Sequence, residues 1–175
     1  MAHGTITGIS GCGKSRLVKE VLIPQARAAG IPTLVLDPVI PPHAAKGEWG
    51  ADACFQDAAA FIRTLKSSRQ CMAFVDEMGI WQKDTASLRE IEWLAMAGRN
   101  WGHVGWFMAQ RRVQMIPPNI RNQCDKAFVF NAAREDLRDF ADAYNIPEVM
   151  DALNFPKGVA YIIKPMEKPR KIRVF

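Results

Sequence analysis

Eight residues near the start of the chain have the types and spacing of a phosphate-binding loop. Closely spaced glycines let consecutive backbone N–H groups curl around a polyphosphate. A lysine at the end of such a loop reaches the β- and γ-phosphates, and the hydroxyl that follows it ligates Mg²⁺. The pattern therefore predicts a nucleotide site. Its residues are Gly8, Ile9, Ser10, Gly11, Cys12, Gly13, Lys14 and Ser15.

Two adjacent carboxylates, Asp76 and Glu77, end an apolar run over residues 71–75. Burying a charge at such a place is costly unless it has a partner, and a metal-bound nucleotide would supply one. We expect Asp76 to help hold Mg²⁺ opposite Ser15. Glu77 would orient and deprotonate a water aimed at the γ-phosphate. This interpretation favours hydrolysis over nucleotide binding alone.

Gln110 and Arg99 are two further candidates for chemistry. Gln110 ends the apolar run 104–109, so it would reach the same sheet edge and contact the γ-phosphate. A capping or loop hydrogen bond is the alternative for this amide. Arg99 follows a helical pattern and need not reach its own nucleotide, because it could enter a neighbouring subunit's site and stabilise transition-state charge. The alternative is a solvated arginine at a helix end.

The elements that must position these residues can be read from hydrophobic patterns. Short apolar runs near residues 3–8, 32–36, 71–75, 104–109 and 126–130 predict strands, and amphipathic patterns between them predict helices. This alternation indicates an α/β fold with a mainly parallel sheet and flanking helices. Residues 158–163 and 171–175 predict an antiparallel strand pair at one edge of that sheet.

Two expectations concern less regular segments. Pro24 should kink or end the helix that follows the phosphate-binding loop. The Pro- and Gly-rich stretch 38–50 predicts a surface loop, in which Trp49 is available to a partner or an adjacent subunit.

Length and composition limit the remaining possibilities. The 175 residues suit one domain, and we expect residues 1–175 to form a single unit. The four cysteines are widely spaced and typical of reduced thiols, although positive charge around Cys12 could lower its pKa. The net charge of +5 is compatible with a polyanionic partner. Neither a leader sequence nor an apolar run of membrane-spanning length is visible, so we expect a soluble intracellular protein.

Several motifs together resemble the FtsK/HerA class of DNA-pumping ATPases, over most of the chain. They are the loop at 8–15, the run Phe-Val-Asp-Glu at 74–77, and Gly-Arg-Asn-Trp-Gly at 98–102 leading to the strand that ends at Gln110. Residues 36–38 and the segment Pro-Pro-Asn-Ile-Arg-Asn at 117–122 also look like that class. The resemblance implies a RecA-like P-loop NTPase that binds ATP and Mg²⁺. It places the strand ending at Gln110 between the loop strand and the Asp-Glu strand, and implies assembly into a ring.

Within the class, the chain looks most like the small genome-packaging ATPases of tailless icosahedral viruses with an internal membrane, since it is almost only the motor core. That resemblance implies translocation of double-stranded DNA into a preformed capsid, with capsid or vertex proteins as partners, in the virion or the host cytoplasm. DNA would be gripped through its phosphates, independently of sequence. Candidate contacts are Arg111, Arg112 and Arg121. A related filamentous-phage assembly ATPase remains an alternative, although such proteins usually add a transmembrane segment.

Two rival functions stay open. A small nucleotide or metabolite kinase would suit the length of the chain, and Asp37 could orient its acceptor. Glu77 and Gln110 argue against a kinase, because a kinase needs neither a residue that activates water nor this amide. A nucleotide-dependent switch without hydrolysis is the other rival, and the complete set of loop and carboxylate residues argues against it.

Overall fold

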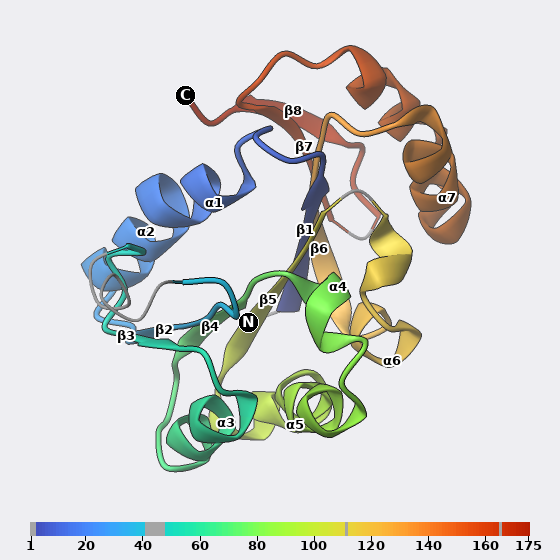
Figure 1. The fold of residues 1–175 in the computed structure, drawn as a ribbon. Coiled ribbons are helices and arrows are strands. Elements are labelled where there is room, and N and C mark those ends of the chain that lie inside the picture. Colours follow the sequence, from blue (N-terminus) through green and yellow to red (C-terminus); the bar gives the residue numbers. More distant parts are fainter. Residues whose placement is uncertain (1–2, 41–47, 111, 165) are drawn as a thin grey trace.

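A computed structural model describes residues 3–40, 48–110, 112–164 and 166–175. Their strands form one eight-stranded sheet in the order β3-β2-β4-β5-β1-β6-β7-β8 (Figure 1). The pairings from β3 through β6 are parallel, and β7 and β8 add antiparallel pairings at one edge. The strands are β1 (His3–Gly8), β2 (Thr33–Leu36), β3 (Ala53–Phe55), β4 (Met72–Val75), β5 (Val104–Gln110), β6 (Cys124–Phe130), β7 (Val159–Ile163) and β8 (Arg170–Arg173).

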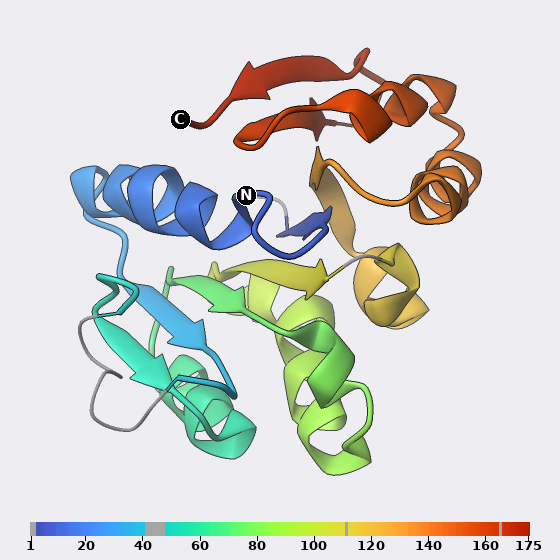
Figure 2. The ribbon, with the colours of Figure 1, turned by 45° about the horizontal axis from the view of Figure 1, so that its top comes forward.

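Helices cover both faces of the sheet. Figure 2 shows α1 and α2 (blue) on one side of the sheet, and α3 (teal) and α5 (green) on the other. The helical elements are α1 (Lys14–Leu17), the π-helical turn η1 (Val18–Leu22), α2 (Ile23–Ala28), α3 (Ala58–Lys66), α4 (Met78–Trp81), α5 (Thr85–Met96), the 3₁₀ turns η2 (Gly98–Trp101) and η3 (Val113–Met115), α6 (Pro118–Arg121), α7 (Arg134–Tyr144) and the 3₁₀ segment η4 (Pro147–Asn154). Within the described ranges, no helix has the length and apolarity needed to cross a bilayer.

The central strands β1, β2, β4 and β5 are buried on both faces, so alternate residues join different cores. Phe107 and Ala109 of β5 pack with α3 and α5, whereas Trp106 and Met108 pack with the helix that follows β1. A third apolar cluster joins α7 and η4 to β6 and β7. Burial on both faces explains why these strands read as continuous apolar runs in the sequence.

The five parallel strands, the flanking helices and the C-terminal antiparallel pair are confirmed as predicted. The strand ending at Gln110 also lies between the other two site strands, because β5 pairs with both β1 and β4. The sequence interpretation missed β3. This edge strand has three residues, each half-buried, and therefore lacks the apolar run that identified the others.

Pro24 does not end the helix after the loop. Helical backbone continues from Lys14 to Ala28, and the π-helical turn Val18–Leu22 lies just before the proline. Proline lacks an N–H and its ring crowds the carbonyl of the preceding turn. Pro24 occupies the first turn of α2, and the wider turn before it accommodates the ring.

The prediction for Trp49 is wrong. Its side chain is only 3% exposed and packs in the cluster around α1 and η1. The indole Nε1 donates to Asp37 Oδ2 at 3.0 Å, and Lys19 Nζ lies 4.9 Å from the ring centroid. The tryptophan therefore fills the core and anchors Asp37. Residues 41–47 of the predicted loop lie outside the described residues.

The close contact between β1 and β5 gives a test of the sheet's centre. Gly4 pairs with Trp106, and a Cβ at Gly4 would overlap the indole ring. We expect Gly4→Ala to lower the free energy of unfolding by about 1–3 kcal/mol, because the ring must leave its packed position. Urea unfolding followed by circular dichroism would measure the change.

Gly79→Ala is the matched control, since its Cβ would meet Met115 Sδ at an ordinary 3.4 Å. Equal effects of the two substitutions would contradict the packing described for Gly4.

Candidate functional site

The carboxyl ends of β1, β4 and β5 bring the predicted loop, the two acidic residues and Gln110 to one edge of the sheet. Gly8 at the end of β1 lies in register with Gln110 at the end of β5. Asp76 and Glu77 follow Val75, the last residue of β4. Figure 2 shows the arrowheads of β4 (green) and β5 (yellow-green) on the same side of the molecule. Ligands of open α/β sheets bind outside this edge.

The loop has the backbone of a tight anion cradle. Gly11 and Gly13 have φ values of 74° and 122°, a region that L side chains rarely adopt. Lys14 is buried, and its Nζ donates to the carbonyls of Gly8 and Ile9, at 2.9 Å each. The ammonium therefore lies inside the curl of the loop, beside the position a polyphosphate would occupy.

Contacts distant in sequence fix the shape of the loop. Ile9 N–H donates to the carbonyl of Asn131, which follows β6, and Gly158 N–H donates to the carbonyl of Cys12, both at 2.9 Å. Burial raises the pKa of the Cys12 thiol, with the nearby Lys14 charge opposing the shift. The expectation of a lowered pKa at Cys12 is wrong, because desolvation outweighs the positive charge.

A cavity of about 240 Å³ opens beside the loop. Gly11, Gly13, Lys14, Ser15 and Arg16 line it from the loop and α1, and Lys157 and Phe175 line it from the C-terminal part. A larger cavity of about 470 Å³ lies away from this edge, beside the start of β6, with Tyr144 and Met166 among its lining residues. Of these two cavities, the smaller one adjoins the loop.

Asp76 carries the strongest electrostatic perturbation at this edge. Burial raises the pKa of its carboxyl group to about 7, and the charges of Glu77 and Asp37 add to the increase. The hydrogen bond from Glu77 N–H, at 2.8 Å, and the charge of Lys14 oppose it. The ionised carboxylate would thus gain from a cation placed beside it.

The oxygen donors fit Mg²⁺ bound together with a nucleotide. Such sites hold the ion with one or two protein oxygens, completed by phosphate oxygens and water. The Asp76 carboxylate and the half-buried Ser15 hydroxyl are donors of that kind. Among the described residues, no group of three or more acidic, histidine or cysteine side chains could hold a metal ion.

Glu77 and Gln110 are in direct contact, because the Gln110 amide Nε2 donates to Glu77 Oε1. Glu77 has a left-handed backbone, with φ 52° and ψ 48°, just before α4. This conformation is unfavourable for a residue with a side chain and is concentrated at functional sites. The structure thus brings Lys14, Asp76, Glu77 and Gln110 to one edge, while their roles stay predictions.

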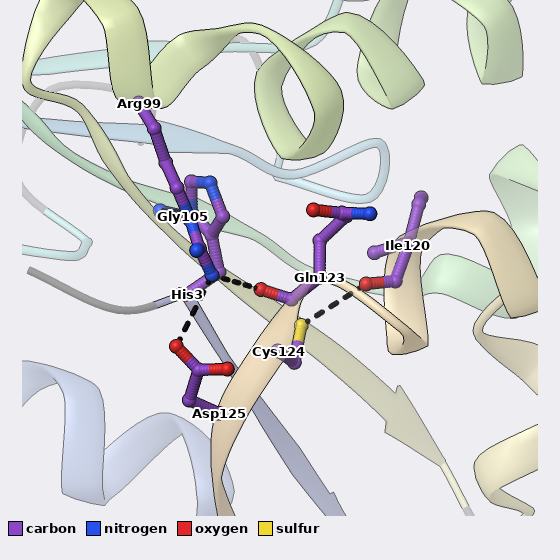
Figure 3. Close-up of polar contacts among 7 residues, drawn as sticks. All are labelled: His3, Arg99, Gly105, Ile120, Gln123, Cys124 and Asp125. Atoms are coloured by element: carbon purple, nitrogen blue, oxygen red, sulfur yellow. Dashed lines mark hydrogen bonds and ion pairs between the residues drawn. The ribbon is translucent and has the colours of Figure 1, made fainter.

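Arg99 lies at the opposite edge of the sheet. It belongs to η2, which precedes the first residue of β5, and its Nη2 donates to the carbonyl of Gln123. The same nitrogen lies 3.3 Å from Asp125 Oδ2 (Figure 3). Arg99 is therefore not brought to the loop of its own chain, and action on a neighbouring subunit stays a prediction.

The candidate DNA contacts do not form one patch among the described residues. Arg112 follows β5 at the nucleotide edge, where its Nε lies 3.3 Å from Asp136 Oδ1. Arg121 ends α6, just before β6, at the opposite edge. Arg111 lies outside the described residues. These three residues stay predictions.

Sequence reasoning missed Arg16, Lys157 and Phe175 as lining residues of the cavity. Arg16 follows Ser15 directly, so its place was readable from the loop motif. The sequence predicts the pairing of β7 with β8, but it carries no local signal that places this pair beside β6 and so brings Lys157 and Phe175 to the loop.

Comparison with known proteins finds matches by structure but not by sequence. No protein-family model matches the sequence, and no curated protein matches it. Among solved structures, the genome packaging NTPase B204 from Sulfolobus turreted icosahedral virus 2, in complex with AMPPCP, superposes with a TM-score of 0.75 at 17% identity. The alignment covers 97% of this chain and 95% of that one. The chain shares the fold of this NTPase.

Two further solved structures share this fold. The pCW3 conjugation coupling protein TcpA aligns with a TM-score of 0.73 at 15% identity, over 98% of this chain and 60% of that one. VirB4 of Thermoanaerobacter pseudethanolicus aligns with a TM-score of 0.72 at 10% identity, over 98% and 88%. The resemblance to FtsK/HerA-class ATPases is thereby confirmed at the level of the fold.

His3, at the Arg99 edge, predicts a pH dependence of stability. Burial lowers the pKa of His3 to about 4, the charge of Arg99 lowers it further, and Asp125 opposes. Between about pH 6.5 and pH 4 the unfolded chain therefore binds the proton more readily, so stability contributed by neutral His3 is lost as pH falls. From pH 7.5 to 4.5 we expect this contribution to cost about 2 kcal/mol.

Urea unfolding of the wild type and His3→Asn at both pH values would isolate this contribution. Asparagine can accept the Gly105 N–H that His3 Nδ1 accepts at 2.7 Å, without titrating. Asp76, with its raised pKa, contributes in the opposite direction in both proteins and cancels in the difference. The His3 assignment would be contradicted if both proteins lost equal stability.

Proposed function

We propose that this chain hydrolyses ATP and couples hydrolysis to the movement of double-stranded DNA, in the packaging of a viral genome into a preformed capsid. The observation that carries the ATPase part is the contact between Glu77 and Gln110 at the edge that holds the loop and Asp76. Together these residues would provide a phosphate cradle in the loop, a cation ligand in Asp76, and a general base in Glu77 that the amide of Gln110 contacts. The proposal that the chain moves DNA is supported by the fold it shares with a genome packaging NTPase and by its net charge of +5.

The chain's own residues divide the reaction among them. The loop amides and the Lys14 ammonium would bind the β- and γ-phosphates, with Asp76 and Ser15 holding Mg²⁺. The ion supplies neutralisation of phosphate charge when bound. Glu77 would orient a water and accept its proton as the water attacks the γ-phosphate. The Lys14 ammonium would stabilise the negative charge that develops between the β- and γ-phosphates as the bond to ADP breaks.

The contact between Gln110 and Glu77 would link the presence of the γ-phosphate to the position of the Glu77 carboxylate, the proposed general base. An amide at the end of β5 can donate either to Glu77 or to a γ-phosphate oxygen beside it. With the γ-phosphate present, Gln110 would turn to the phosphate and leave Glu77 free for water. After phosphate release it would return to the contact with Glu77 that the structure shows.

Arg99 would act between subunits. Its position at the far edge suits a ring in which each subunit offers this edge to the nucleotide of the next. The guanidinium would exchange its contacts with Gln123 and Asp125 for phosphate oxygens of the neighbouring site. We further propose contacts with DNA phosphates, capsid or vertex proteins as partners, and the virion or host cytoplasm as the location.

Phosphate release from ATP tests the enzymatic part. At high protein concentration and low salt we expect release that rises with protein concentration and with added double-stranded DNA. Glu77→Gln should lower the rate at least 100-fold while leaving ATP binding intact, because it removes the base and keeps the shape.

Glu90→Gln, on α5 away from the site, is the matched control. Loss of ATP binding in Glu77→Gln would contradict the role of Glu77. Phosphate transfer only to an added nucleoside monophosphate or metabolite would favour the kinase alternative.

Mixing of variants tests the role of Arg99. Arg99→Ala should lower DNA-stimulated turnover roughly 10³-fold without weakening ATP binding, because the residue reaches another subunit's transition state. Adding Glu77→Gln subunits should restore part of the activity, since they supply an intact arginine to sites with an intact base.

Arg89→Ala, which removes an exposed arginine from α5, controls for the loss of charge. Failure of the mixture to recover activity, with both variants folded and associated, would count against action between subunits.

A further inference from the structure

The cavity beside the phosphate-binding loop has a wall that the loop motif does not supply. Phe175 and Lys157 come from the segments that follow β8 and precede β7. Opposite them lies Arg16, two residues beyond Lys14. Figure 1 shows the end of the chain marked C near the start of α1. An aromatic ring and two cations thus adjoin the place where phosphates would bind.

Backbone contacts hold Phe175 against the loop. Gly158 N–H donates to the carbonyl of Cys12 at 2.9 Å, and Val174 N–H donates to the carbonyl of Gly158 at 2.7 Å. The ring edge fits between two glycines, since a Cβ would lie 2.9 Å from the ring at Gly13 and 2.8 Å at Gly158. Such close approach requires glycine at both positions. The backbone hydrogen bonds and the two glycines therefore fix the position of the Phe175 ring beside the loop.

One face of the Phe175 ring already holds a planar group. The Arg16 guanidinium lies 3.8 Å from the ring centroid. Within the described part of the chain, Arg16 forms an ion pair with Glu20 on the helix surface, and its side chain is 50% exposed. An exposed pair of this kind contributes little stability, so the guanidinium can leave the ring at small cost.

We propose that Phe175 is the surface on which the base of the nucleotide stacks, replacing the Arg16 guanidinium, which moves toward the phosphates or the ribose. This inference rests on the proposed nucleotide site. Stacking uses the π face that all bases share, and purines offer the larger face. Of the polar side chains that line the cavity, Arg16 and Lys157 offer only hydrogen-bond donors to a base edge, and the Ser15 hydroxyl is assigned to Mg²⁺. We therefore expect the site to prefer purine nucleotides and to accept ATP and GTP with affinities within about threefold of each other.

A purely structural role for Phe175, as a support for the loop, makes a different prediction. Loss of support would weaken every ligand held by the loop amides and Lys14, including a triphosphate without a base. Loss of a stacking surface would weaken only ligands that carry a base. Comparison of ATP with inorganic tripolyphosphate therefore separates the two roles.

Isothermal titration with Mg²⁺ and either ATP, GTP, CTP or inorganic tripolyphosphate provides the test, in a Glu77→Gln background that prevents turnover. We expect Phe175→Ala to weaken ATP and GTP about tenfold and to change tripolyphosphate affinity less than twofold. Phe175→Leu keeps an apolar contact with the glycines but lacks a π face, and should resemble Phe175→Ala. Phe175→Trp should retain ATP binding.

Equal weakening of ATP and tripolyphosphate, or unchanged ATP binding in Phe175→Leu, would overturn the stacking role. A preference for ATP over GTP of more than tenfold would overturn base tolerance. Failure of the Glu77→Gln parent to bind either ATP or tripolyphosphate would instead contradict the proposed nucleotide site itself.

Discussion

The carboxylate of Asp76 is removed from water at the end of β4, next to further negative charge on Glu77 and Asp37. Lys14, the nearby cation, directs its Nζ to two loop carbonyls and offsets this charge only in part. Ionisation of a buried carboxyl group is unfavourable until a cation arrives. The loop, the carboxylates and the amide of Gln110 therefore make physical sense together as the proposed site of a metal-bound polyphosphate, whose cation would offset the buried negative charge.

The sheet that carries this site also separates the candidate nucleotide residues from Arg99. β5 has Gln110 at one end, and Arg99 precedes its other end. A strand of seven residues spans roughly 20 Å, which is too far for an arginine side chain to bridge. The nucleotide edge and the arginine edge of one chain thus cannot meet within that chain. Only a second copy, turned so that its arginine edge faces the first copy's loop, could join them.

The parts of this arrangement that the sequence predicts are those with local signals. The loop motif and the apolar runs before Asp76 and Gln110 can each be recognised from a few consecutive residues. The apolar run of the edge strand β3 is only three residues long, too short to identify a strand. Trp49 does lie in a loop, but the sequence does not show that it is buried and bonded to Asp37. Phe175 is the extreme case, because it reaches Gly13 only through the pairing of β6, β7 and β8. Contacts between distant residues depend on the whole topology and leave no local pattern.

The two hydrogen bonds that tie the phosphate-binding loop to Asn131 and Gly158 have a consequence for the order of folding. Both join residues more than 120 positions apart, and contacts of such sequence separation form late because long loops must close first. During synthesis the first strand and the glycines of the loop emerge early, yet the backbone that fixes their shape arrives only with Asn131 and Gly158. The loop would therefore reach its final shape late in folding, after the strands that surround it.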